Sequence, residues 1–340
     1  MAITIHDTAT LMAVQNNQKP VSSYWLDLLF PMVQTFDTES IDFDIIEGGA
    51  RIAPFVSPTA QGVVLKNEGF NTRRFKPAYL KPKHVVKPNA QLKRIAGEAY
   101  GGAISPEARI NAAIASNLMK EKDLILRRLE VMACEAVLTG KNTVTGENYP
   151  TQIVDFQRDA NQYIDATATP WSNVSHDIVS DLDEWCNQTQ LLSGYAPSRV
   201  TVTPDVWSHM RKNTSVEKSL DTTYAGNSST LDRGVGTGEK VQYKGMLGTS
   251  LEVHVYNDIY ENDSGVNVPL MGAGQVVLTS SGVEGVRCFG AIQDAEVMMP
   301  MEMYPKMWLN PDPSVVYTMT QSAPLMVPTR PNATLVAKVL

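Results

Sequence analysis

The stretch Ser105-Pro-Glu-Ala-Arg-Ile-Asn-Ala-Ala-Ile-Ala-Ser-Asn-Leu-Met-Lys-Glu-Lys-Asp-Leu-Ile-Leu-Arg-Arg-Leu-Glu-Val-Met-Ala-Cys-Glu-Ala-Val-Leu-Thr-Gly140 predicts one long helix at the centre of the fold. Ser105 suits the N-cap, Pro106 the first helical position, and Gly140 the position just past the end. A helix over 105–139 would span about 50 Å at the usual rise per residue. Such a helix suits an extended, plate-like subunit better than a compact enzyme.

Apolar residues in this helix recur at steps of three, four or seven, which predicts one buried stripe. The stripe residues are Ala108, Ala115, Leu118, Ile125, Leu129, Met132 and Ala136. Charged residues fill the remaining positions, namely Lys120, Lys122, Asp123, Arg127 and Arg128. The pattern therefore predicts an amphipathic helix with one face on a core.

Length and composition indicate a globular chain of about two domains, because 340 residues with 43% hydrophobic content allow a substantial core. The first residues lack the pattern of a signal peptide, and no apolar run reaches the ~18 residues of a membrane helix. Cys134, Cys186 and Cys288 lie far apart, which favours buried free thiols over disulfides or a zinc site. We expect a soluble protein made in a cytoplasm.

A strongly basic segment lies beside an acidic one. Residues 51–94 carry ten Lys or Arg against the single acid Glu68, a local charge of +9 in a chain of net charge -7. Residues 1–50 carry seven acids against Lys19. The basic segment alternates prolines with β-favouring runs, and Asn67-Glu-Gly69 with Asn71 suggests a turn at the middle of a two-stranded arm. A lone hairpin is not stable in water, so we expect the arm to lie on an acidic surface of another copy. The alternatives are nucleic-acid binding, which the neighbouring acids disfavour, and a solvated hairpin.

The pattern changes to mixed α/β between about 171 and 291. It predicts a helix near 174–192, strands at 198–203, 251–256 and 275–279, a helix starting at Pro204, and an exposed loop over 225–238. Long β runs at 296–303 and 314–320 should pair beside the long helix. The glycines of 234–240 resemble a phosphate loop only superficially, because Val241 stands where Ser or Thr must follow Lys240. The five histidines are scattered singly, so we predict no catalytic, cofactor or metal site and no enzyme activity.

Several strings, in order along the chain, resemble the lambda-type phage major capsid protein family, phage capsid protein E. They are Tyr79-Leu-Lys-Pro-Lys-His84 with Pro88, Thr145-Gly-Glu147, Tyr243-Lys-Gly-Met246 with Gly248, Ile292-Gln-Asp-Ala295, and Tyr304-Pro-Lys306 with Gln321-Ser-Ala-Pro-Leu-Met326. The resemblance implies an α+β chain with the Hong Kong 97 phage-type major capsid fold. Its parts would be an N-terminal arm at 1–47, an extended E-loop at 48–95, a peripheral domain at 96–165 and 292–340 with the spine helix at 105–139, and an axial domain at 166–291.

The resemblance also implies partners. The chain would assemble with itself into pentamers, hexamers and a whole shell, and would meet a portal protein and a small decoration protein. Because the chain begins almost at the arm, we expect a separate scaffolding protein. Nothing marks a lysine and asparagine as a cross-linking pair, so we expect a non-cross-linked shell. A net negative inner wall would enclose double-stranded DNA without sequence-specific binding, and no membrane is involved.

We therefore predict a structural protein of the virion, assembled in the bacterial host cytoplasm into the icosahedral head shell of a tailed phage or prophage. The alternatives are an encapsulin-like nanocompartment shell and, less favoured, a soluble α/β enzyme with a basic lid. The residues expected at contacts between subunits are Arg73, Arg74, Lys76, Lys81, Lys83 and His84.

Overall fold

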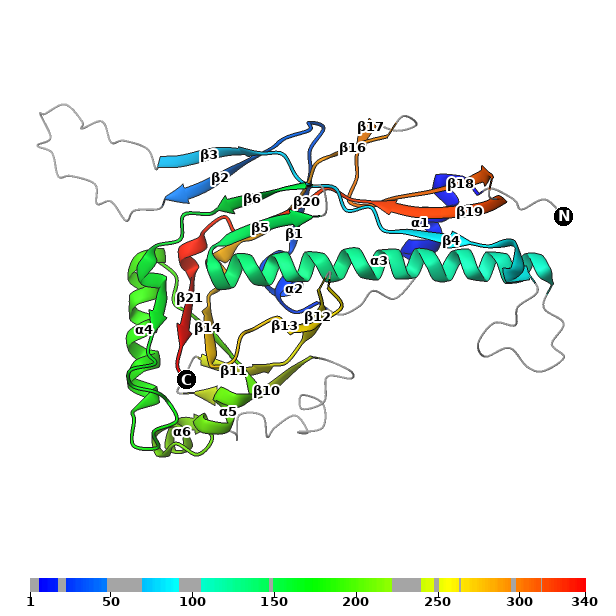
Figure 1. Ribbon diagram of the computed structural model, residues 1–340. Coiled ribbons are helices and arrows are strands. Elements are labelled where there is room, and N and C mark those ends of the chain that lie inside the picture. The colour runs from blue at the N-terminus through cyan, green and yellow to red at the C-terminus, as the bar shows by residue number, and fades with distance from the viewer. Residues whose placement is uncertain are drawn as a thin grey trace, which may run out of the picture.

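The fold is extended along one long helix, with strands above it and a larger sheet below its C-terminal end (Figure 1). The computed structural model describes residues 6–17, 23–47, 69–91, 105–146, 149–221, 240–247, 251–262, 264–294, 298–312 and 314–340. The predicted loop at 225–238 and most of the phosphate-loop-like segment at 234–240 lie outside these ranges.

The predicted spine helix is confirmed as α3 (Pro106–Thr139), with the Ser105 side chain accepting a hydrogen bond from the amide of Ala108. Its buried stripe differs from the prediction at the N-terminal end, where Ile110 and Ile114 are buried and Ala108 is exposed. The larger isoleucines cover more apolar surface, so they set the face that meets the core. The stripe also contains two buried acids, Glu121 and Glu130.

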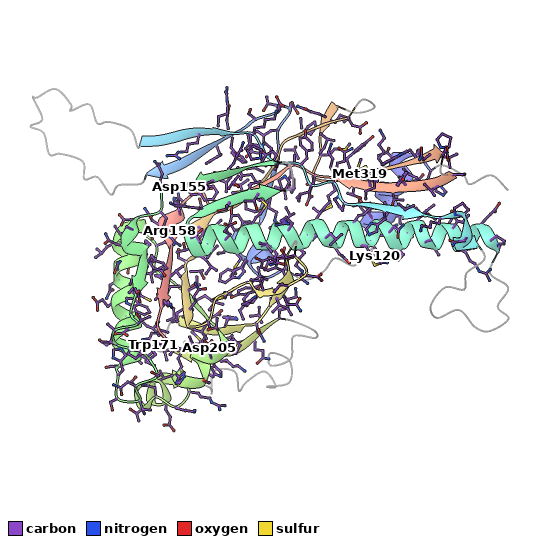
Figure 2. The ribbon with its side chains drawn as sticks, in the orientation of Figure 1. Lys120, Asp155, Arg158, Trp171, Asp205 and Met319 are labelled. Atoms are coloured by element: carbon purple, nitrogen blue, oxygen red, sulfur yellow. The ribbon has the colours of Figure 1, made fainter. Side chains whose placement is uncertain are left out.

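The C-terminal end of α3 closes on Gly140, whose φ of 70° suits a left-handed C-cap. Arg158 lies beside this end (Figure 2) and donates to the carbonyls of Val137 and Leu138 at 2.5 and 2.8 Å. A guanidinium there satisfies unpaired carbonyls and complements the helix dipole. Burial lowers the pKa of Arg158 to about 10.

A three-stranded sheet covers the N-terminal half of α3 (Figure 1). Its order is β18 (Tyr304–Pro311), β19 (Ser314–Gln321), β4 (Lys83–Val86). Helix α1 (Thr8–Asn16) lies on the same side as α3, since Leu11, Ile114 and Val316 share one buried cluster. The predicted strand at 314–320 and its place beside the long helix are thus confirmed.

A seven-stranded sheet lies below the other end of α3 and has two buried faces. In β14, Val277 joins the cluster under α3, whereas Val276 and Leu278 join a second cluster under α4 (Ile178–Ser193). The sheet order is β7 (Tyr163–Asp165), β21 (Thr334–Lys338), β14 (Gln275–Thr279), β8 (Arg199–Val202), β11 (Leu251–Tyr256), β10 (Val241–Leu247), β9 (Leu220–Asp221).

This sheet corrects one point of the expected layout. The C-terminal strand β21, expected with the peripheral segments, is hydrogen-bonded to β14 and β7. Its alternating Leu335, Val336 and Ala337 are fully buried because both faces of the sheet are covered. The strands predicted at 198–203, 251–256 and 275–279 are confirmed, as are the helices near 174–192 and from Pro204, the latter being α5 (Pro204–Met210).

Smaller elements join these layers. Helix α2 (Trp25–Leu29) and the sheet of β1 (Met32–Thr35), β15 (Val286–Phe289) and β20 (Pro324–Val327) lie against α3. Another short helix is α6 (Thr214–Ser219), and further hairpins are those of β5 (Lys141–Gly146) with β6 (Tyr149–Asp155), β12 (Ile259–Glu261) with β13 (Asn267–Pro269), and β16 (Ala291–Gln293) with β17 (Met298–Pro300). The long strand predicted at 296–303 is wrong in extent, since the chain bends after Pro300 before β18 begins.

The basic arm is two-stranded, but its strands are not those expected. Strand β3 (Gly69–Phe75) pairs with β2 (Ile41–Glu47), which the sequence assigned to the N-terminal arm. The turn predicted at 67–71 is therefore wrong, because Gly69 and Asn71 lie within a strand. In the rest of the predicted E-loop, 48–68 and 92–95 lie outside the described ranges, and 83–86 form β4, which belongs to the sheet on α3.

Candidate assembly surfaces and the buried acids of the spine helix

Arg74 and Lys76, two basic residues of the arm, form ion pairs with acids of the same chain. The Arg74 guanidinium donates to both carboxylate oxygens of Asp42 at 2.7 and 3.0 Å, and Lys76 forms an ion pair with Glu39. The pairing follows from register, since Asp42 and Arg74 are opposite residues of β2 and β3. Hydrogen bonding to Arg74 lowers the pKa of Asp42. These pairs are exposed and screened by solvent, so each contributes little to stability and serves mainly to fix the register of the arm.

The other predicted contact residues are spread along the chain that leads to α3. Arg73 donates to the carbonyl of Asp155 at 3.2 Å. The ammonium of Lys81 lies 4.9 Å from the ring centroid of Tyr79, and that of Lys83 lies 4.1 Å from the ring centroid of Tyr317. The six residues do not gather at one point.

His84 leads to the first buried acid of the spine helix. Its Nδ1 lies 3.2 Å from Glu121, which is fully buried and also accepts hydrogen bonds from the hydroxyls of Thr318 (2.7 Å) and Thr320 (2.8 Å). Gln15 of α1 donates to the Thr320 hydroxyl at 2.8 Å. Burial raises the pKa of Glu121. One carboxylate thus connects α3 with β4 and β19, and through Thr320 with α1.

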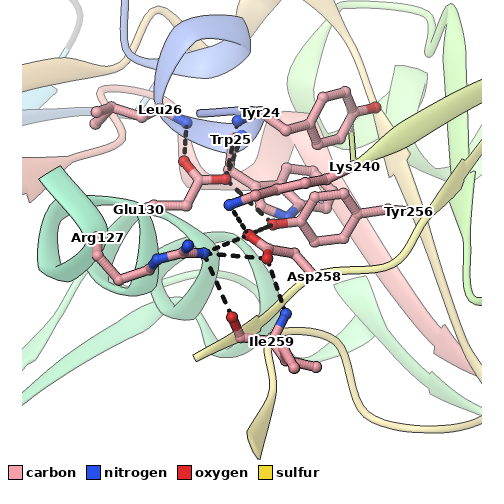
Figure 3. Close-up of polar contacts among 9 residues, drawn as sticks. All are labelled: Tyr24, Trp25, Leu26, Arg127, Glu130, Lys240, Tyr256, Asp258 and Ile259. Carbon is pink, nitrogen blue, oxygen red and sulfur yellow. Dashed lines mark hydrogen bonds and ion pairs between the residues drawn. The ribbon is translucent and has the colours of Figure 1, made fainter. Parts of the chain in front are cut away.

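Glu130 is the second buried acid, and it caps the N-terminus of α2. Figure 3 shows its carboxylate directed at the backbone amides of Tyr24, Trp25 and Leu26, which donate at 3.0, 2.9 and 2.9 Å. The Tyr256 hydroxyl donates at 3.3 Å. An acid at a helix N-terminus satisfies unpaired amides and complements the dipole, while burial raises the pKa of Glu130.

Beside this acid, Asp258 receives two cations. Arg127 of α3 donates to both of its carboxylate oxygens at 3.0 and 2.9 Å, and Lys240 approaches to 2.7 Å (Figure 3). Asp258 follows β11 and Lys240 precedes β10, so both belong to the segment of the seven-stranded sheet. The pairs link the spine helix to that sheet.

The opposite end of α2 is held by a cation. Arg287 of β15 donates to the carbonyls of Phe30 and Leu26 at 2.6 and 3.0 Å and to Asp27 at 2.8 Å. A five-residue helix is not stable alone, so its charged partners at both ends and the burial of Trp25 define its place. The arrangement fixes the N-terminal segment to the spine helix and the seven-stranded sheet.

Sequence reasoning missed Glu121, Glu130 and Asp258. The helical pattern did contain a signal, because Glu121 falls three residues after Leu118 on the predicted apolar stripe. A charged residue on a buried stripe indicates a satisfied polar site.

The described residues do not present a reactive centre. A cavity of about 830 Å³ lies at the C-terminal end of α3, and its cations Arg73, Lys141 and Arg158 already contact Asp155 or backbone carbonyls. Within the described ranges, no three His, Cys, Asp or Glu side chains are placed to hold a metal ion. Burial raises the pKa of Cys186 to about 11, which leaves little thiolate at neutral pH. Among the described residues, no helix is both long and apolar enough to span a membrane.

Comparison with known proteins covers nearly the whole chain. The family model for phage major capsid protein E matches residues 7–339. The chain is 32% identical over 341 residues to the major capsid protein of Enterobacteria phage P21, with 98% of both sequences covered. It is 31% identical over 339 residues to the major capsid protein of Escherichia phage lambda, with 97% of this chain and 98% of that protein covered.

Solved structures agree. A putative capsid protein of an E. coli CFT073 prophage superimposes with a TM-score of 0.78 at 25% identity, with 99% and 100% of the two chains covered. The mature capsid of bacteriophage PhiM1 matches with a TM-score of 0.50 at 8% identity over 95% of this chain and 88% of that one, which shows the fold alone. The predicted Hong Kong 97 phage-type fold is confirmed, and the chain belongs to the phage major capsid protein E family of structural head proteins.

Proposed function

We propose that this chain forms the pentamers and hexamers of an icosahedral head shell that encloses the double-stranded DNA of a tailed phage. The family match over residues 7–339 carries the proposal and favours a phage head over a nanocompartment. Identical subunits joined by heterologous contacts close into rings, and rings can tile a shell. In sedimentation velocity, purified protein should form species far larger than the 37.3 kDa chain. A species that stays monomeric at high concentration would oppose the proposal.

The proposal extends to partners and location. A separate scaffolding protein, a portal protein and a small decoration protein would meet the shell, which assembles without covalent cross-links in the host cytoplasm. The chain would act only as a structural protein. Its net charge of -7 supports a wall that confines DNA without binding it tightly, because few phosphates would be neutralised.

The division into parts is also proposed, with an N-terminal arm at 1–47, an E-loop at 48–95, and peripheral and axial domains meeting near 165 and 291. Two observations modify it. Strand β2 of the arm segment pairs with β3 of the E-loop segment, and β21 lies in the sheet of the axial segment. Where the two larger parts meet, Tyr256 of the axial segment would contact Glu130 of α3, and Asp258 would contact Arg127.

We further propose that Arg73, Arg74, Lys76, Lys81, Lys83 and His84 contribute to contacts between subunits. Arg74 offers a direct test, because 73% of its side chain is exposed despite the pair with Asp42. Replacing Arg74 with Asp should impair assembly. The swap of Arg74→Asp with Asp42→Arg restores the pair within the chain but not a contact with an acidic neighbour. We expect assembly to remain impaired in the swap; full recovery would confine Arg74 to a role inside the subunit.

A further inference from the structure

The three-stranded sheet on α3 has two different faces. Thr318 and Thr320 of β19 point toward α3, where they bond Glu121. Since side chains alternate along a strand, Tyr317 and Met319 point the other way. On β4, His84 likewise faces Glu121, which directs Lys83 and Val85 outward. Helix α1 lies on the same side as α3, so the opposite face is not covered by either helix.

This outer face consists of Lys83, Val85, Trp308, Tyr317 and Met319, the last labelled in Figure 2. The rings of Trp308 and Tyr317 stack with centroids 5.4 Å apart, and the ammonium of Lys83 lies 4.1 and 5.6 Å from the Tyr317 and Trp308 centroids. Val85 is Tyr317's partner in register and remains 43% exposed. The two aromatic residues and Met319 are half-buried.

Aromatic residues and methionine are enriched at the centres of protein interfaces, where anchors are rigid and lose little entropy on binding. The stack restricts both rings before any partner arrives, and Lys83 adds a cation over them. The alternative is that these side chains only stabilise the sheet, and cross-strand packing would then explain the stack of Trp308 on Tyr317. That alternative gives no reason for the neighbouring Val85 to remain exposed.

We propose that this outer face is an interface for a second copy of this chain, an inference that rests on the proposed function. Charge supports that partner. The strand β4 and its flanks expose Lys81, Lys83 and Lys87, whereas the whole chain carries a net charge of -7 and exposes Asp183 and Glu184 on α4. A basic, aromatic face on an acidic chain is complementary to other copies of that chain.

Trp308 itself provides the test. Trp25, Trp171 and Trp185 are buried, so acrylamide quenching of the subunit reports mainly Trp207 and Trp308. The difference between wild type and Trp308→Phe isolates Trp308, in free subunits and in purified shells. We expect its quenching constant to fall several-fold in the shell. Equal quenching in the two states would overturn the inference while leaving the shell, and hence the proposed function, intact.

A substitution tests the same face without touching the stack. Val85→Glu adds an acid at an exposed site, so the subunit should keep its melting temperature while the concentration needed for assembly rises about tenfold, the effect of losing one good contact. The matched control Val266→Glu, at a residue 57% exposed on the β12–β13 hairpin and outside the three-stranded sheet, should assemble as wild type does. Normal assembly of Val85→Glu would contradict the proposal. So would a Trp308 that is quenched in shells and becomes protected only when a decoration protein is added.

Discussion

Removing the Glu130 side chain should release α2 from the spine helix. The carboxylate accepts three backbone amides at 2.9–3.0 Å and the Tyr256 hydroxyl at 3.3 Å. Each buried amide left unpaired costs about 1–3 kcal/mol, and three of them would cost about 3–9 kcal/mol. Removal also relieves the desolvation of a buried charge, worth several kcal/mol. The net loss in the unfolding free energy of Glu130→Ala should be about 3 kcal/mol.

The assay is urea unfolding of the unassembled subunit, with hydrogen exchange of the peptide that covers 23–31. A matched control is Glu135→Ala, on the same helix, where the carboxylate accepts one backbone amide, that of Thr143, at 3.1 Å. We expect a loss of about 1 kcal/mol there, with no faster exchange in α2. If Glu130→Ala cost no more than Glu135→Ala, or if α2 exchanged at the wild-type rate, the role given to Glu130 would be wrong.

Three further outcomes follow from the spine helix. Leu118→Ala, at a fully buried position, should lower the unfolding free energy by about 2–5 kcal/mol in the same assay; a loss below about 1 kcal/mol would show that the site collapses freely. Gly140→Ala should cost about 1–3 kcal/mol and lower the melting temperature, because φ is +70° and a Cβ would lie 2.8 Å from that of Arg158. Burial raises the pKa of Glu130 above its ordinary value of 4.5, so its protonation is favoured in the folded state. Wild-type stability relative to Glu130→Gln should therefore be highest below pH 4.5 and decline as pH rises through the raised pKa; a difference that grows with pH would reverse the sign.

Local signals predicted the parts of the fold that depend on neighbouring residues. Ser105, Pro106 and Gly140 mark the ends of α3 because caps and φ preferences act within a few residues. The apolar alternation of 251–256 and the short apolar run of 275–279 likewise located β11 and β14. The prediction of the buried stripe was wrong at the N-terminal end of α3, because the apolar pattern does not distinguish small residues such as Ala108 from large ones such as Ile110.

Long-range pairing could not be predicted in the same way. Strand β3 fits several partners by pattern, and only the whole structure shows that β2 takes that place. Strand β21 pairs with β7 across more than half of the chain, which no window of sequence reveals. The buried acids were missed for a related reason. A glutamate is assigned to solvent by default, and the amides that satisfy Glu130 lie about a hundred residues away.

Electron microscopy of the overexpressed protein, made alone and with any candidate for the proposed scaffolding protein, tests the central claim most directly. We predict closed shells built from five-fold and six-fold rings, with α3 and the three-stranded sheet of each subunit placed in the shell wall. The account would be contradicted by preparations that contain only folded monomers or small open oligomers at high concentration in both conditions.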